Sequence, residues 1–415
     1  MTTALSTSAD VVVVGSGPAG LSAAIELRKL GVTRVVVVER ELAGGGVPRH
    51  SHHTGFALRD LHRLMSGPRY AQELVRRAET AGVELLVGTT VTDLRSNQLV
   101  QLSSRHGVAM IEARAVILAT GARERPRSAR LVPGDRGAGV FTTGQLQQWT
   151  YLKRLPVGSR AVVVGAEHVS FSAMVTLRHA GVRTIALTTE LPRHQSAAVF
   201  AAATRLLFRV PILTSTRVAG VNGRPRVSEV TLEDVSSGRR WTESVDTVVF
   251  TGDWIPDNEL ARRAGLDIDE GTLGPSSDRF GRTSSPSVYA AGNLLHPVET
   301  ADVAALRGRH VARKVARDLQ VGATLSDPDP ATVIAEAPLT WVWPNRMSSP
   351  LDVESLFFRV GRFDARRTLR AHQDGELIGT VRTPALVPNR SLRVSGGVFA
   401  NVNPRGGTIR LRLAE

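Results

Sequence analysis

The stretch that decides the fold is "DVVVVGSGPAGLSAA", Asp10–Ala24. A run of four valines leads into three glycines spaced GxGxxG, and apolar side chains then recur at helical spacing. This order predicts a strand, a tight turn and a helix. A turn of this kind lets a diphosphate lie against the bare amides at the helix N-terminus.

A second β-branched run ends at Glu39, 19 residues after Gly20. A carboxylate at this place accepts hydrogen bonds from ribose hydroxyls and repels a 2′-phosphate. The pattern therefore favours FAD or NAD over NADP. The residues expected to bind this nucleotide are Gly15, Ser16, Gly17, Pro18, Ala19, Gly20, Glu39 and Arg40.

The same order of elements returns in "RAVVVGAEHVSFSAMVTLRHAGVRTIALTTE", Arg160–Glu190. Only the first glycine of the motif is kept, and Glu167 brings a carboxylate to the place of the diphosphate. Glu190 favours NAD over NADP, whereas Arg193 and His194 argue for NADP. An NAD(P)H site, a site for another nucleotide and a purely structural domain all stay open. The residues of a second site would be Gly165, Ala166, Glu167 and Glu190.

The composition excludes several kinds of redox and metal chemistry. The chain has 415 residues, which suits two or three domains, and it has no cysteine. Disulfides, thiolate metal sites, cysteine-ligated clusters and dithiol redox steps are therefore excluded for this chain. All but three of the 52 basic residues are arginines, and they are scattered, so the net charge of +14 does not predict nucleic-acid binding. No signal peptide or membrane segment is expected, which makes the cytoplasm the predicted location.

Three segments carry a resemblance to a known family. "GSGPAGLSAA", "AVILATGARERP" and "SVYAAGNLLHP", in this order, resemble the pyridine nucleotide–disulfide oxidoreductase superfamily. The resemblance implies an α/β, glutathione-reductase-like fold of two interleaved Rossmann-like domains. We expect a FAD-binding domain at 1–125 and 285–326, an NAD(P)-binding-like domain at 126–284, and a small, mostly β domain at 333–415. A linker is expected at 327–332.

The resemblance also implies further residues that bind the flavin cofactor. The segment ending in "ATG" lines the crossover between domains in this superfamily, and the late "GN" turn brings a helix N-terminus toward the flavin. Asn293 stands where the family usually has aspartate. These additional residues are Val91, Ala119, Thr120, Gly121, Gly292 and Asn293.

Four arginines follow the ATG turn in "GARERPRSAR". They are expected to form either a solvated connection between domains or an anion clamp for a phosphate or an acidic substrate.

A closer resemblance involves "GGVPRHSHHTGF", Gly45–Phe56. This segment is similar to one in flavoprotein subunits associated with glycerol-3-phosphate-, opine- or hydroxyproline-type dehydrogenases. It implies that Gly46 and Val47 pass close to the flavin. Ser51 stands where those relatives have cysteine. His53 is the acid–base candidate, since imidazole titrates near neutral pH; the alternative is that all three histidines are hydrogen-bonded loop residues. No metal site is expected.

The function expected from these features is that of a FAD-dependent oxidoreductase. Its flavin would be reduced by NAD(P)H or by an amine or hydroxy substrate, and the electrons would pass to a small molecule or a protein. One alternative is a flavoprotein subunit of a heteromeric amine-, opine- or hydroxyproline-type dehydrogenase. Another is a flavin monooxygenase, although the fingerprint of that group is absent. A non-catalytic interaction protein would require that FAD is not retained. The expected partners are a small-molecule substrate and either a dehydrogenase subunit or a second copy of the chain, with no nucleic acid and no membrane.

Overall fold

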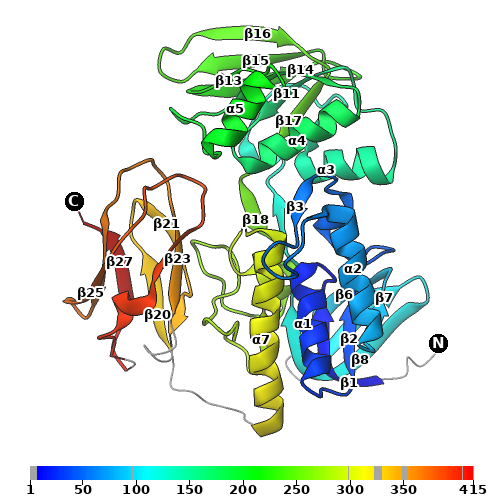
Figure 1. The fold of residues 1–415 in the computed structure, drawn as a ribbon, viewed down its shortest axis with the longest axis vertical. Helices are drawn as coiled ribbons and strands as arrows, with labels where there is room; N and C mark the ends of the chain where they lie inside the picture. The colour runs from blue at the N-terminus through cyan, green and yellow to red at the C-terminus, as the bar shows by residue number, and fades with distance from the viewer. Residues whose placement is uncertain are drawn as a thin grey trace. The chain divides into compact units, whose positions relative to one another are not determined.

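The structure is a computed structural model that describes residues 7–95, 98–297, 299–321, 330–347, 354–403 and 405–414. The chain forms two compact units (Figure 1). The first contains Met1–Arg49, Gly55–Ala122 and Ile255–Glu415, and the second contains His50–Thr54 and Arg123–Trp254. The division into three domains stays a prediction. Of the linker expected at 327–332, residues 327–329 lie outside the described residues, and Ala331 and Thr332 belong to strand β20 (Ala331–Ala335) instead.

The first unit is built on a sheet whose middle is parallel. The strand order is β5-β2-β1-β8-β7-β6, with β19 also paired to β8. Valine runs occupy the central strands because a parallel sheet is buried on both faces. The parallel strands are β1 (Thr7–Val14), β2 (Val35–Val38), β5 (Glu84–Leu86), β8 (Gly107–Leu118) and β19 (Val288–Ala290). The antiparallel extension is β7 (Leu99–Ser104) and β6 (Thr89–Leu94).

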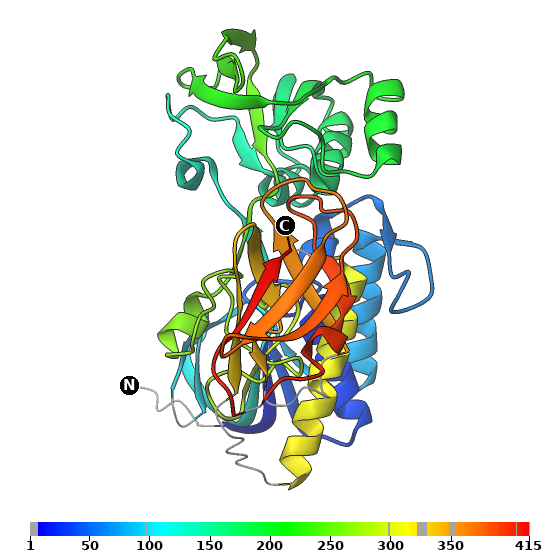
Figure 2. The same ribbon diagram turned by 90° about the vertical axis from the view of Figure 1, so that its left-hand side faces the viewer.

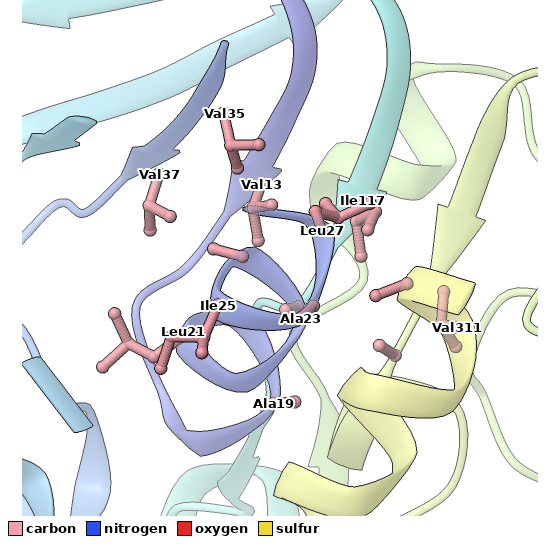
Figure 3. Packing of buried hydrophobic residues seen from close by; sticks show 14 of the residues in the cluster. Val13, Ala19, Leu21, Ala23, Ile25, Leu27, Val35, Val37, Ile117 and Val311 are labelled. Atoms are coloured by element: carbon pink, nitrogen blue, oxygen red, sulfur yellow. The ribbon is translucent and has the colours of Figure 1, made fainter. Parts of the chain in front are cut away.

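Three helices cover one face of this sheet: α1 (Pro18–Lys29), α2 (Gly67–Thr80) and α7 (Ala301–Val321). Figure 3 shows α1 between the valines of the sheet and Val311 of α7. Helices α1 and α7 can approach closely because Gly308 has no side chain. A Cβ there would overlap the carbonyl of Ala19. This packing fixes the start of α1, where the first glycine turn lies.

The C-terminal part of the first unit is a pair of β-sheets around their own core (Figure 2). Asp374 and Gly375 have φ of +52° and +88°, and they connect β24 to β25 as the expected two-residue hairpin turn. One sheet contains β22 (Arg346–Met347), β20 (Ala331–Ala335), β27 (Ile409–Leu413), β24 (Thr368–Gln373) and β25 (Glu376–Arg382). The other contains β21 (Leu339–Trp343), β23 (Ser355–Val360) and β26 (Leu392–Ser395).

The second unit repeats the parallel arrangement with five strands. Their order is β10 (Val140–Thr142), β17 (Thr247–Phe250), β11 (Arg160–Val164), β12 (Arg183–Thr188) and β13 (Ile212–Leu213). One face packs on α3 (Thr143–Gln147) and α4 (His168–His179). The other packs on an antiparallel meander of β14 (Thr216–Asn222), β15 (Glu229–Asp234) and β16 (Arg240–Ser244).

Shorter elements complete the fold. They are β3 (Thr54–Phe56), β4 (Met65–Ser66), β9 (Ala122–Glu124), β18 (Trp254–Pro256), α5 (Ala198–Leu206) and α6 (Glu259–Arg263). The expected α/β class is confirmed, with two strand–turn–helix units and a β-rich C-terminal part. Within the described ranges, no helix is long and apolar enough to cross a membrane.

Candidate dinucleotide sites

The first glycine turn brings β1 and α1 together so closely that side chains do not fit. Gly15 has φ of +102°, and a Cβ there would lie 2.5 Å from the carbonyl oxygen of Ala119. A Cβ on Gly20 would overlap the carbonyl of Gly15. Both glycines are therefore required by close backbone approach.

Gly17 has a different reason to be glycine. It is the N-cap of α1 with φ of −69°, and a Cβ there would meet nothing within 4 Å. No side chain caps this helix, and its first turn holds no acidic residue. The amides of the first turn are thus left for an outside acceptor, and the space beside Gly17 suits a diphosphate.

Glu39 ends β2 with its carboxylate fixed in place and only 8% exposed. Its Oε2 accepts hydrogen bonds from the Ser16 amide (3.0 Å) and the Ser16 hydroxyl (2.6 Å). Its Oε1 accepts from the amide of Glu41 (2.9 Å). The carboxylate therefore lies next to the first turn, as ribose binding requires. Arg40 instead points to Asp257, 3.3 Å away.

Two more segments of the first unit meet this turn. Gly46 has φ of +62°, and a Cβ there would lie 2.8 Å from the Cα of Gly17. Gly292 has φ of +70°, and a Cβ there would lie 2.6 Å from that of Ala19. The structure thus brings residues far apart in the sequence to the start of α1. Val47 is exposed and Val91 is partly buried.

The asparagine in the late turn has a structural role. The Nδ2 of Asn293 donates to the carbonyl of Glu299 (3.2 Å), and its Oδ1 accepts from the amide of Glu299 (2.8 Å). An aspartate carboxylate could not make the first of these bonds. The side chain therefore closes the loop that leads into α7. In the ATG segment, the Thr120 hydroxyl donates to the Asp257 carbonyl (2.8 Å), and the carbonyl of Gly121 accepts from the Asp257 amide (2.9 Å).

The second turn is closed by its own side chains. Glu167 is the N-cap of α4, and its carboxylate accepts a hydrogen bond from the backbone of Ser170 in a reciprocal capping box. The Thr251 hydroxyl donates to Oε1 of Glu167 (2.6 Å) and lies 2.7 Å from the Ser170 hydroxyl. A carboxylate therefore already occupies the N-terminus of α4. Glu190, the other acid of this predicted site, is exposed after β12.

The carboxylate of Glu124 lies near this second turn and was missed from the sequence. It is 6% exposed and accepts a hydrogen bond from the Gly144 amide (2.9 Å). Burial raises the pKa of Glu124 to about 7, and the nearby carboxylate of Glu167 acts in the same direction. The signal in the sequence was an acidic residue three positions after the ATG segment, among arginines.

Residues 9–308 match the family model described as pyridine nucleotide-disulphide oxidoreductase. The chain belongs to this family. It is accordingly a flavin-dependent oxidoreductase with the Rossmann-type nucleotide-binding fold of the family, which confirms the predicted class of enzyme.

Its curated relatives include components of larger enzymes. An opine oxidase subunit from Agrobacterium tumefaciens (strain Ach5) is 28% identical over 356 residues, which cover 78% of this chain and 68% of the relative. The hydrogen cyanide synthase subunit HcnB of Pseudomonas protegens is 26% identical, over 74% of this chain and 70% of the relative. An opine oxidase subunit from Rhizobium meliloti is 25% identical over 68% of this chain, and the match spans 58% of its own length.

Solved structures show the same fold. Thioredoxin reductase from Lactococcus lactis aligns with a TM-score of 0.64 at 17% identity, over 76% of this chain and 100% of that one. A NAD-dependent persulfide reductase from A. fulgidus aligns with a TM-score of 0.57 at 18% identity, over 92% of this chain and 72% of that one. The predicted fold of two Rossmann-like domains is confirmed by these likenesses.

In this family member, the segment that contains the three histidines, His50–Thr54, belongs to the second unit. The buried His50 and Ser51 both contact Oε1 of Gln147, at 3.2 and 3.1 Å. His52 stacks on Tyr151 with ring centroids 3.9 Å apart, and burial lowers its pKa. The Nδ1 of His53 lies 2.8 Å from the carbonyl of Thr54. His50 and His53 thus have hydrogen-bond partners, whereas His52 has a stacking partner. The proton-transfer role of His53 stays a prediction.

Two of the arginines after the ATG segment correct the sequence-based expectation. Arg127, only 6% exposed, donates to the backbone carbonyls of Val132 (3.1 Å) and Asp135 (2.5 Å). Arg130 donates to the carbonyls of Thr251 (3.0 Å) and Gly252 (2.8 Å). These side chains hold loops of the second unit together, so neither a solvated connection nor an anion clamp describes them. The sequence could not reveal this because carbonyl acceptors have no residue signature.

Proposed function

We propose that the chain is the FAD-binding subunit of a heteromeric oxidoreductase, in which an amine-, opine- or hydroxy-acid-type substrate supplies the electrons. The observation that carries this proposal is the contrast between the two turns. The first leaves the amides of α1 for an outside anion. The second binds its own carboxylate there, which disfavours NAD(P)H as the electron donor. The names of the relatives as subunits support a heteromeric enzyme.

FAD is the cofactor that the first unit fits. In our proposal the amides of Gly17, Ala19 and Gly20 bind its diphosphate and Glu39 binds its ribose, while the amides of Gly15 and Ser16 hold the turn through Val38 and Glu39. Gly46, Val47, Val91, Ala119–Gly121, Gly292 and Asn293 line the rest of the site. When bound, FAD supplies an acceptor for two electrons. The close approach of Gly46 and Gly292 to α1 keeps side chains out of that space.

His53 is the proposed acid–base residue. If its Nδ1–H donates to the carbonyl of Thr54, 2.8 Å away, Nε2 is the basic nitrogen of the neutral ring. His53→Ala should then lower the substrate-driven rate by about a hundredfold and leave the flavin content unchanged. His52→Ala, which removes the ring stacked on Tyr151, is the matched control and should retain that rate. Equal rates for both variants would remove His53 from the proposal.

A second candidate is a stand-alone oxidoreductase in which NAD(P)H reduces FAD. The parallel five-stranded sheet of the second unit and the exposed Glu190 after β12 favour it. In that case Gly165, Ala166, Glu167 and Glu190 would bind the nucleotide. A second copy of the chain could then take the place of a partner subunit. The cytoplasm stays the predicted location under either candidate.

Anaerobic mixing of the purified yellow protein with NADH, NADPH or dithionite separates the two candidates. The proposed subunit should be bleached by dithionite and not by either nicotinamide. Its reassembled complex should be bleached by an N-carboxyalkyl amino acid, by L-proline or 4-hydroxyproline, or by sn-glycerol 3-phosphate. Prompt bleaching by NADH or NADPH would overturn the proposal in favour of the second candidate. A colourless protein that takes up no FAD would overturn both.

A further inference from the structure

A cluster of aromatic rings and charged side chains lies between α7 and the C-terminal strands of the first unit. Trp341 and Trp343 come from β21, and Phe357 comes from β23, which Figure 1 shows next to β21. The ring of His296, from the loop before α7, lies 5.1 to 5.6 Å from the three aromatic rings. We call this group, with Glu299, Arg307 and Arg359, the arginine–tryptophan cage.

Two arginines stack on these rings. The guanidinium carbon of Arg307 lies 4.0 Å from the centroid of Trp343 and 5.2 Å from that of Phe357. That of Arg359 lies 5.3 Å from the centroid of Trp341. Arg359 is only 8% exposed, and its Nε has no hydrogen-bond partner among the described residues. Stacking uses the faces of the guanidinium groups and leaves the N–H donors at their edges available.

The cage holds more positive than negative charge. Glu299 is the carboxylate that acts on both arginines, and burial raises its pKa. Burial lowers the pKa of Arg307 and of Arg359 to about 10, so both carry their charge at neutral pH. Arg279 and Arg393 add positive charge near Arg307. The buried Arg359 and the half-buried Arg307 thus share one carboxylate, and burying an uncompensated charge is costly.

The cage also contains buried polar atoms with unmet hydrogen bonds. The Nδ1 of His296, whose side chain is 2% exposed, and Oε1 of Glu299 lie 3.7 Å apart. Neither has a hydrogen-bond partner in the part of the chain that the structure describes. Burial and the two arginines lower the pKa of His296, so its ring is neutral. Unmet polar atoms at one place are rare in folded proteins and indicate a bound water or ligand.

We propose that the arginine–tryptophan cage binds a small organic carboxylate, held by the free edges of Arg307 and Arg359 against the rings of Trp341 and Trp343. The planar guanidinium matches a carboxylate in two parallel hydrogen bonds. The aromatic walls favour a ligand with an apolar part over a fully hydrated sulfate or phosphate. The free oxygen of Glu299 would accept a hydrogen bond from an amino group if the carboxylate belongs to an amino acid.

Two of the five tryptophans of the chain lie in the cage and provide a built-in reporter. FAD-loaded protein is titrated with sodium propionate, L-alanine or sodium sulfate at constant ionic strength, and tryptophan fluorescence and thermal unfolding are followed. Propionate or L-alanine should change the fluorescence with saturation and raise the unfolding temperature, whereas sulfate should do neither. A preference for L-alanine over propionate would identify an amino acid, and the reverse a plain carboxylic acid. A response equal for sulfate, or none for either carboxylate, would overturn the proposal.

Substitutions in the cage test whether the response to carboxylates arises there. Arg307→Gln should weaken carboxylate binding by roughly tenfold or more, the loss expected for one charge-assisted pair of hydrogen bonds. Arg307→Lys is the second variant, in case Arg307→Gln does not fold. It keeps the charge but loses the forked guanidinium, so it should weaken carboxylate binding to a similar extent. Arg239→Gln is the matched control, because this exposed arginine of the second unit lies over a different ring, that of Trp241, at 5.4 Å. An unchanged affinity in both Arg307 variants would overturn the proposal.

Discussion

The two strand–turn–helix units of this chain share one local architecture and differ at the helix N-cap. In the first, Gly17 leaves the start of α1 without a side-chain cap. In the second, the carboxylate of Glu167 caps α4 and is itself bound by Thr251. The same backbone can therefore either present its amides to a ligand or use them within the fold. The residue at the N-cap decides between these uses. A first-turn amide that is hydrogen-bonded to a capping side chain is not available to a ligand.

The largest effect is expected from closing the first turn. Gly17→Val should reduce the flavin content to near zero, because the side chain would enter the space proposed for the diphosphate. The protein should still fold, since a Cβ at Gly17 meets nothing within 4 Å and φ is −69°. Absorbance of the bound flavin and circular dichroism measure the two properties.

Gly361→Val serves as the control for this test. A Cβ there makes ordinary contact, 3.6 Å from the Thr340 side chain, in the C-terminal part of the same unit. It should retain the flavin. A folded Gly17→Val protein with unchanged flavin content would contradict the assignment of the first turn.

Opening the second turn tests the same comparison from the other side. Glu167→Gly removes the carboxylate from the start of α4, so NAD(P)H should bind about tenfold more tightly. Loss of the cap should lower the free energy of unfolding by about 1 kcal/mol. Anaerobic NADH titration and chemical denaturation measure these changes.

Glu167→Gln separates charge from the cap in this comparison. It keeps an acceptor for the Ser170 amide but carries no charge, so it should show most of the gain in affinity with less loss of stability. If neither variant binds NAD(P)H more tightly, the carboxylate is not what closes the turn.

A third test concerns the buried acid near the second turn. The pKa of Glu124 is raised to about 7 in the folded protein from an ordinary value of 4.5. Its stabilising contribution is therefore full below about pH 4.5 and is lost as the pH rises through about 7. Between pH 5 and pH 8, Glu124→Gln should gain about 2–3 kcal/mol of stability relative to the parent protein.

Denaturation of both proteins across that pH range measures the difference. Glu190→Gln is the control, since this side chain is exposed and should leave the pH dependence unchanged. Parallel stability curves for Glu124→Gln and the parent would show that Glu124 is ionised throughout.

The smallest effect is expected at the late turn of the first unit. Asn293→Asp loses the hydrogen bond to the carbonyl of Glu299, which should reduce stability by about 1 kcal/mol. It should also weaken flavin retention by no more than a few-fold. Asn401→Asp, which loses a comparable bond to the carbonyl of Ile378, tests whether the effect on flavin is specific to the turn. Equal flavin retention in both would leave Asn293 a purely structural residue.

The sequence was most informative where short-range rules apply. The valine runs, the glycine spacing and the Asp374–Gly375 turn each depend on a few adjacent residues, and each forms the predicted element. The role of Glu124 and the carbonyl contacts of Arg127 and Arg130 depend on segments distant in the sequence. Periodicity carries no information about such pairs, so they were missed or misread.

The amino-acid sequence by itself determined the class of fold, both glycine turns and the lack of thiol chemistry, because valine runs, unsubstituted Cα atoms and the absence of cysteine act locally. Only the tertiary structure decided which distant segments support the use of each turn. It placed Gly46 and Gly292 against the start of α1, and Thr251 against Glu167 at the start of α4. The physical reason is that hydrogen-bond satisfaction and free space around a helix N-terminus are set by whichever distant segments the packed core brings there.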